Sequence, residues 1–248
     1  MEQVKRNSTS DKTNICKEKP INLTVNEKDI TTFMCTPRNL EELGVGYLYN
    51  QNIIESPEEL IYLGACKRLE AINIQLNKKL PKQKLNLKEV LASSCGKSIN
   101  REKIKNLGKN NSNLSVSINK LKELAYEMFN STVIYKKTGG VHCTALTNKD
   151  ELLYLEEDVG RHNAVDKIIG KAVLNKDNFK DKVIFTSGRI SSDMILKISN
   201  TEIPIVVSRS IPTNLALDIA EESQITVVGR ILRKEPLIYT YSNRVKQN

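Results

Sequence analysis

One cysteine stands in a setting that favours sulfur chemistry. Cys95 lies in the stretch Ser93-Ser94-Cys95-Gly96-Lys97, where small neighbours leave its sulfur accessible. A lysine close to a thiol can lower its pKa and favour the nucleophilic thiolate. Such a thiolate, placed just before a mobile loop, could receive a sulfur atom, carry it as a persulfide and deliver it to an acceptor. The alternative, that Cys95 is an ordinary surface or buried cysteine, stays open.

The other cysteines give weaker signals. The five cysteines occupy positions 16, 35, 66, 95 and 143, and no Cys-x-x-Cys pair occurs among them. This spacing argues against a structural zinc site and a thioredoxin-like motif, so we predict no metal site. Cys143 stands next to His142 and is a second candidate thiol. The remaining cysteines are expected to be small buried hydrophobes.

Three polar stretches follow apolar runs, and each carries an arginine before a predicted helix. They are Glu156 to Asn163, Thr186-Ser187-Gly188-Arg189, and Ser208 to Asn214. In open α/β sheets, ligands bind beyond the carboxyl ends of the strands. Helix N-termini and arginines both suit phosphate groups. The pattern therefore predicts a site for a phosphate-bearing ligand, with capped turns and surface arginines as the alternative.

Both histidines of the chain lie in polar, glycine-containing stretches. His142 follows the Gly-Gly turn of Thr138-Gly139-Gly140-Val141, where the backbone can approach another group closely. His162 lies in the first arginine-bearing stretch. This placement favours a role for both histidines in a functional site. Whether they orient a ligand or hold the loops in place stays open.

Apolar periodicity predicts an α/β fold. Strands are expected over residues 21–25, 31–36 and 72–76, with a helix opened by a capping box between Asn39 and Glu42. A second helix is expected from residue 118, with Ser117 as its N-cap. From residue 152 onward, short strands alternate with short helices, which predicts a mostly parallel sheet covered on both faces.

The same pattern divides the chain into four parts. Residues 1–18 are interpreted as a flexible lead-in, and residues 19–95 as a smaller N-terminal α+β region. Residues 96–113 are polar and poorly periodic, which predicts a mobile loop after the candidate thiol. Residues 114–242 are expected to form the α/β domain.

Composition limits the classes of protein. The chain has 248 residues, 39% of them hydrophobic, and a net charge of +9. No apolar run approaches the roughly 20 residues that span a bilayer, and the first residues lack an apolar segment, so we expect a cytoplasmic protein without a membrane partner. The positive charge suits a polyanion. Only 5% of the residues are aromatic, however, which argues against a surface on which nucleic-acid bases stack.

The eleven residues Glu157 to Lys167 resemble the signature stretch of the FdhD family. Members of this family are formate dehydrogenase accessory proteins that act as sulfur carriers. The resemblance covers roughly residues 18–240. Shorter matching pieces lie, in the family's order, at residues 34–37, 40–44, 138–142, 186–189 and 210–213.

The resemblance implies a fold and an activity. The fold would be a three-layer domain similar to cytidine deaminases. The activity would be that of a sulfurtransferase, which takes sulfur from a cysteine desulfurase as a persulfide on Cys95. The acceptor would be the molybdenum or tungsten bis-pterin guanine dinucleotide cofactor, before its insertion into the catalytic subunit of formate dehydrogenase. A guanine nucleotide such as GDP would fit the same site, and the family suggests a homodimer.

The resemblance also assigns cofactor-binding residues, and two departures from the family pattern accompany them. The position three after Cys95 is Ser98, so a second thiol that would release sulfur through an internal disulfide is missing. The run Arg233-Lys234-Glu235-Pro236 lacks the family's turn with glycine and asparagine. The assigned residues are His142, Gly160, Arg161, His162, Ser187, Gly188, Arg189, Arg230, Ile231, Leu232, Arg233, Lys234 and Glu235.

Two other classes of protein fit the sequence less well. A zinc-dependent deaminase-like hydrolase would need His-x-Glu and a later Pro-Cys-x-x-Cys. Here the residue two after His142 is Thr144, and no such cysteine pair follows. A basic nucleic-acid-binding protein is permitted by the charge, but no recognised motif supports it.

Overall fold

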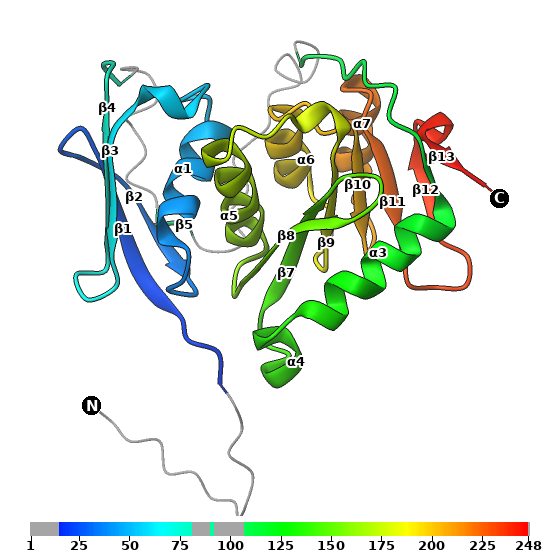
Figure 1. Cartoon of the computed structure of the whole chain (residues 1–248), viewed down its shortest axis with the longest axis horizontal. Helices are drawn as coiled ribbons and strands as arrows, with labels where there is room; N and C mark the ends of the chain where they lie inside the picture. Colours follow the sequence, from blue (N-terminus) through cyan, green and yellow to red (C-terminus); the bar gives the residue numbers. More distant parts are fainter. Residues whose placement is uncertain (1–14, 81–89, 92–106, 248) are drawn as a thin grey trace, which may run out of the picture.

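The computed structural model describes residues 15–80, 90–91 and 107–247. Within them, a five-stranded and a six-stranded sheet lie on opposite sides of a layer of helices (Figure 1). This arrangement confirms the predicted α/β class. None of the described helices combines the length and the apolar character needed to cross a bilayer.

The five-stranded sheet is built mainly from the N-terminal residues. Its order is β3-β4-β1-β2-β5, and β5 pairs parallel to β2. Residues of β1 alternate between a buried and a more exposed face, which is why the apolar alternation predicted this strand correctly. The strands are β1 (Lys19–Val25), β2 (Lys28–Cys35), β3 (Leu60–Cys66), β4 (Ala71–Leu76) and β5 (Val90–Leu91).

The six-stranded sheet has the order β12-β11-β10-β9-β7-β8. Its strands are β7 (His142–Thr147), β8 (Leu152–Asp158), β9 (Val183–Thr186), β10 (Ile205–Ser208), β11 (Thr226–Gly229) and β12 (Leu237–Thr240). Only the β9–β10 and β10–β11 pairings are parallel; the other three are antiparallel. The predicted mostly parallel sheet is confirmed in part: β8, β9, β10 and β11 share one direction, whereas β7 and β12 run against them. Short connections allow antiparallel returns, so β8 folds back on β7 and β12 on β11.

Helices cover both faces of this sheet, as predicted. Side chains of Leu146, Ile184 and Val206 join the core cluster with α5, α6 and α7. Their neighbours Ala145, Phe185 and Val207 point to the opposite face, into the cluster with α3. The helices are α1 (Leu40–Asn50), α3 (Ile118–Ser131), α4 (Ile134–Thr138), α5 (Arg161–Leu174), α6 (Ser192–Ser199) and α7 (Asn214–Glu222). Short 3₁₀ turns are η1 (Pro57–Glu59), η3 (Phe179–Asp181) and η4 (Ser242–Arg244), and the strands β6 (Val116–Ser117) and β13 (Val245–Lys246) pair with each other.

One of the two predicted helix caps is confirmed. Ser117 Oγ accepts a hydrogen bond from the Lys120 N–H at the start of α3. The capping box predicted at Asn39 was wrong, because Asn39 has a left-handed backbone (φ 49°) and makes no side-chain cap. Its side-chain amide instead donates to Glu156 in β8. The Asn39 side chain therefore bonds to a residue distant in sequence and not to the end of its own helix.

The described end of the predicted mobile loop is anchored to the domain. The Asn110 side chain donates to Glu202 O over 2.6 Å, and its backbone N–H donates to Ser223 O. The buried Arg244 guanidinium donates to Asn110 O and Ser112 O from the other side. Residues 96–106 of that prediction lie outside the described residues.

Two glycines set the distance between the helices of the central layer. A Cβ on Gly46 of α1 would lie 1.8 Å from Asp166 O, and one on Gly170 of α5 would lie 1.9 Å from Glu42 O. In both cases the obstacle is backbone, which cannot turn aside as a flexible side chain can. The missing side chains therefore allow α1 and α5 to touch, as Figure 1 shows for these two helices.

We expect Gly170→Ala to destabilise the fold by about 3 kcal/mol or more, because its methyl group forces two packed helices apart. Urea unfolding at equilibrium measures this loss. Gly108→Ala is the matched control, since a Cβ at that position meets no atom within 4 Å. Equal stability of the two variants would contradict the glycine contact as the constraint on this helix pair.

Candidate functional site

The polar stretches meet at one edge of the six-stranded sheet. Strands β8, β9, β10 and β11 run in the same direction, so their carboxyl ends lie together, and the antiparallel β7 begins at this same edge. The loops that start at Val159, Ser187, Arg209 and Arg230 therefore converge there. The predicted convergence of the arginine-bearing stretches is confirmed, although Glu156 to Asp158 belong to β8 itself and not to a loop.

His142, Ser187, Gly188 and Arg161 are in direct contact at the centre of this edge. His142 Nδ1 lies 3.3 Å from Ser187 Oγ, which also accepts the N–H of Cys143. A Cβ on Gly188 would lie 3.1 Å from Arg161 Cβ and 3.5 Å from His142 Nδ1. Since Gly188 has no side chain, the arginine and the histidine can both pack against its backbone. His142 is the half-buried first residue of β7 and not a loop residue.

Positive charge is concentrated at this edge. Burial lowers the pKa of Arg161, and the nearby Arg189 lowers it further, while Asp193 acts in the opposite direction. Arg189 itself is exposed. A bound anion near Arg161 would offset the unfavourable effect of burial and of Arg189 on its guanidinium charge.

Both histidines are held in the neutral form. Burial lowers the pKa of His162 to about 3, and Lys197, Arg161 and His142 add to that effect. Burial followed by the charge of Arg161 also lowers the pKa of His142, against an opposing effect of Asp158. At neutral pH each ring therefore carries one donor and one acceptor nitrogen and adds no positive charge.

The predicted C-terminal run joins this edge only in part. Ser208 Oγ donates to Gly188 O, and the N–H groups of Arg230 and Ile231 donate to Ser210 O and Ser208 O. Arg230 has a left-handed backbone (φ 55°) that turns the chain here. Ile231 is buried in the core cluster beside α3, so its side chain is not available to a ligand. Leu232 packs against the same cluster, and Arg233, Lys234 and Glu235 are exposed.

A buried ion pair holds the turn that carries Arg161 and His162. Lys167 Nζ lies 2.6 Å from Asp158 Oδ2, and neither side chain is exposed. Asp158 Oδ2 also accepts the Thr36 N–H, and Lys167 donates to Thr36 O. The other carboxylate oxygen accepts from the Gly160 N–H and from the Asn163 side chain.

These contacts explain much of the signature stretch as structure. Asp158, Asn163 and Lys167 connect the end of β2 to the start of α5, because Asn163 also donates to Met34 O. Sequence reasoning did not assign these residues a role. The only signal in the sequence was that Asp158 and Lys167 both occur in the signature stretch. That they form a buried ion pair becomes evident only from the fold.

Two of the described cysteines, Cys35 and Cys143, are buried and poor nucleophiles. Burial raises the pKa of Cys143 to about 11 and that of Cys35 to about 12. The prediction of Cys143 as a second candidate thiol was therefore wrong, since its side chain lies in the core cluster beside α3. Cys16 and Cys66 are half-buried, not buried as expected, and the Cys16 thiol donates to Gly140 O. Cys16 is thus the close neighbour of the Gly-Gly turn. Cys95 lies outside the described residues.

No group of three or more histidine, cysteine, aspartate or glutamate side chains in the described part of the chain is placed to hold a metal ion.

The geometry defines a two-sheet α/β protein with arginine and histidine residues gathered at one edge of a sheet, and comparison with known proteins identifies its family. Residues 16–246 match the FdhD/NarQ family. The chain is 34% identical to the "Sulfur carrier protein FdhD" of Shouchella clausii over 94% of this chain and 90% of that one. It is 33% identical to the protein of the same name from Bacillus subtilis, over 93% and 89%.

A solved structure agrees with this match. The crystal structure of a putative formate dehydrogenase accessory protein from Desulfotalea psychrophila superposes with a TM-score of 0.76 at 28% identity, over 93% of this chain and 90% of that chain. The chain belongs to the FdhD/NarQ family.

We expect Lys167→Met to destabilise the protein by about 3 to 5 kcal/mol, because it leaves the buried Asp158 carboxylate without its cation. Lys171→Met, on the same helix but half-exposed beside Glu156, is the control and should cost less than about 1 kcal/mol. The double variant Asp158→Asn/Lys167→Met should recover part of the loss. Chemical denaturation measures all three, and a small effect of Lys167→Met would argue against the network.

Acid should weaken the folded state through His162. The unfolded chain protonates this ring near pH 6.5, whereas the folded protein does so only near pH 3, so stability falls as the pH drops between these values. From pH 7 to pH 5 this loss is at most about 2 kcal/mol. In His162→Gln the difference in unfolding free energy between the two pH values should shrink accordingly. An unchanged difference would show that His162 titrates normally in the folded protein.

Proposed function

We propose that this chain is a sulfur carrier that serves the maturation of a formate dehydrogenase, acting as a sulfurtransferase. The observation that carries the proposal is the family match over residues 16–246, together with the arginine and histidine edge at the signature stretch. Relatives named "Sulfur carrier protein FdhD" and a solved structure described as a putative formate dehydrogenase accessory protein support it. The six-stranded sheet and its helices would be the family's three-layer cytidine-deaminase-like domain.

Cys95 is the proposed carrier thiol, and chain connectivity supports this choice. Strand β5 pairs parallel with β2, with Leu91 opposite Phe33. The chain therefore leaves β5 toward the end of β2 where Thr36 contacts Asp158 and Val159. Cys95 follows four residues later, a length that spans at most about 14 Å. This tether limits how far the thiol can lie from the end of β5.

Loading and release of sulfur can be written as two exchanges. The Cys95 thiolate attacks the outer sulfur of a cysteine desulfurase persulfide; the S–S bond there breaks and the desulfurase thiolate leaves. Cys95 then carries the persulfide without net oxidation. Delivery of the outer sulfur as sulfide needs two electrons, which a thiol reductant supplies by attacking the inner sulfur and forming a mixed disulfide. This route requires no second cysteine near Cys95, consistent with Ser98 at that position.

The acceptor we propose is the molybdenum or tungsten bis-pterin guanine dinucleotide cofactor, bound as cargo before insertion into the formate dehydrogenase catalytic subunit. It carries two pyrophosphates, which match the guanidinium groups of Arg161 and Arg189 and the N-terminus of α5. The neutral rings of His142 and His162 would contribute hydrogen bonds. Arg230 would extend the same surface, and GDP would occupy part of it.

A two-variant experiment separates loading from acceptor binding. The purified protein is incubated with a cysteine desulfurase and cysteine, and its peptides are examined by mass spectrometry; GDP binding is measured by calorimetry. Cys95→Ala should lose the added sulfur and keep GDP binding. Arg189→Gln should keep the added sulfur and bind GDP about tenfold more weakly, because one charge-assisted hydrogen bond is lost.

Two controls make the result specific. Lys149→Gln removes an exposed charge from the turn between β7 and β8, at the opposite edge of the sheet, and should change neither readout. Cys66→Ala removes another accessible thiol and should still load sulfur. Persulfide on the wild-type protein at a cysteine other than Cys95 would reject the proposed carrier.

A further inference from the structure

Arg209, from the third arginine-bearing stretch, lies at the same edge of the six-stranded sheet as His142. It directly follows β10 at the carboxyl end of that strand. Its backbone N–H donates to Thr186 O, at the end of the neighbouring β9. The next residue, Ser187, is the one whose Oγ lies 3.3 Å from His142 Nδ1. The backbone of Arg209 is therefore joined to the strand end at the centre of the candidate site.

Two aromatic residues order the Arg209 side chain. Arg209 Nη1 donates to the hydroxyl of Tyr135, and the guanidinium carbon lies 5.5 Å from the centre of the Phe129 ring. The two rings also contact each other, with centroids 5.8 Å apart, and both pack against the core cluster beside α3. A guanidinium over an aromatic face is attracted to it. An arginine held in this way loses less side-chain freedom when it binds a ligand.

The short helix that carries Tyr135 is fixed by a carboxylate of the signature stretch. Glu157 Oε2 accepts the N–H groups of Val133 and Ile134 over 3.0 Å each, and Glu157 Oε1 accepts that of Tyr135 over 2.6 Å. These groups lie at the start of α4, where backbone N–H groups have no partner within the helix. Tyr135 is thus held at its backbone as well as at its hydroxyl.

The guanidinium of Arg209 keeps donors for a further partner. It is exposed, and Tyr135 is the one hydrogen-bond acceptor that its side chain contacts within the described part of the chain, where it forms no ion pair. An arginine has five N–H donors in a fork that matches phosphate oxygens. Arg244 shows the contrast, since it is buried and donates to three backbone oxygens. Arg209 is ordered like a structural arginine but is not saturated like one.

We propose that Arg209 binds a phosphate group of the ligand at this edge, and that Tyr135 and Phe129 position its guanidinium. This role rests on the proposed function, because the ligand is the phosphate-bearing one named there. Arg161 opens α5, whereas Arg209 stacks on a residue of α3, so the two approach the edge from opposite faces of the sheet. A ligand that lies over the strand ends would contact both.

Calorimetric titration with GDP and with inorganic pyrophosphate tests the contact. Arg209→Met keeps the length of the side chain and removes the guanidinium, so it should bind both probes about tenfold more weakly. Arg209→Lys keeps the charge without the planar fork and should still bind about threefold more weakly. Lys137→Met is the matched control, because it removes an exposed charge from α4 and should change neither affinity more than about twofold.

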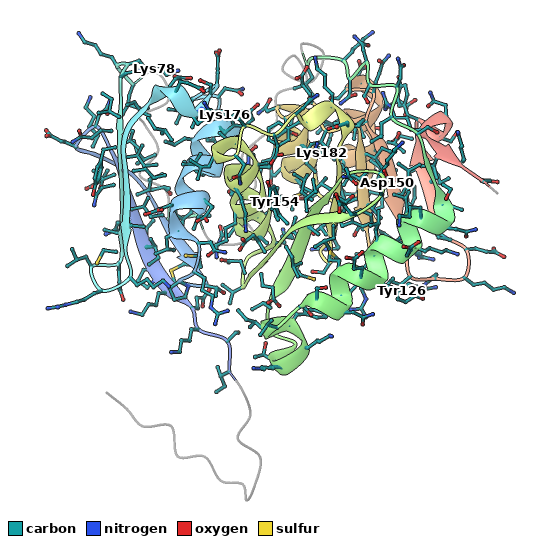
Figure 2. The ribbon with its side chains drawn as sticks, viewed as in Figure 1. Lys78, Tyr126, Asp150, Tyr154, Lys176 and Lys182 are labelled. Atoms are coloured by element: carbon teal, nitrogen blue, oxygen red, sulfur yellow. The ribbon has the colours of Figure 1, made fainter. Side chains whose placement is uncertain are left out.

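A double-mutant cycle tests whether Tyr135 positions Arg209. Tyr135→Phe removes only the hydroxyl that accepts from Arg209, and should weaken GDP binding about threefold. In the Arg209→Met background the same change should have no further effect, a coupling that a purely structural role of the hydroxyl would not produce. Tyr126→Phe is the control: Tyr126 is 52% exposed on α3, where Figure 2 labels it, and loss of its hydroxyl should not change binding.

The outcomes separate this role from the proposed function. If Arg189→Gln weakens GDP binding and Arg209→Met does not, Arg209 is no phosphate ligand and the proposed function stands. A wild-type protein that binds neither probe would overturn both. If Arg209→Met loses affinity for GDP but not for pyrophosphate, Arg209 contacts the nucleoside, and the phosphate contact is refuted. Equal losses in Arg209→Met and Lys137→Met would also refute it, because net charge alone would explain them.

Discussion

The buried pair of Asp158 and Lys167 is the contact on which the candidate site depends. Both charges are fully removed from water, and such a pair is tolerated only when its remaining hydrogen-bonding capacity is satisfied. Here the carboxylate accepts from Lys167, Thr36, Gly160 and Asn163. The pair thereby fixes the end of β2 against the start of α5, and with it the backbone from which Arg161 and His162 project.

This fixed point also relates the two sheets to each other. Strand β5 pairs with β2, and the residues that lead to Cys95 follow β5. Strand β5 therefore ends near the same end of β2 that Asp158 contacts. At Gly46 and Gly170 the backbones of α1 and α5 lie in direct contact, which fixes the distance between these two helices. The carrier thiol and the anion site that we propose lie on separate parts of the chain, and this frame would hold the attachment points of both at a fixed separation.

The sheet edge that carries Arg161 and His162 is formed at an electrostatic cost. Arg161 is partly buried near Arg189, and His162 is held neutral among positive groups. The anion that we propose as ligand would relieve these unfavourable interactions. The hydrogen bonds from Ser208 and Arg230 extend the same edge, so its width is set by the strand order and not by any one loop.

The sequence by itself determined the local elements and the family. Alternation in β1, the helical spacing of α3 with its Ser117 cap, and the run from Glu157 to Lys167 depend on neighbouring residues, and all could be predicted. Tertiary structure decided which polar groups found distant partners and which side chains were buried. Asn39 bonds to Glu156 instead of its own helix, Cys143 and Ile231 lie in the core, and β7 and β12 run antiparallel to their neighbours. These contacts join residues that are distant in sequence, such as Asn39 and Glu156, and the local patterns around them did not encode them.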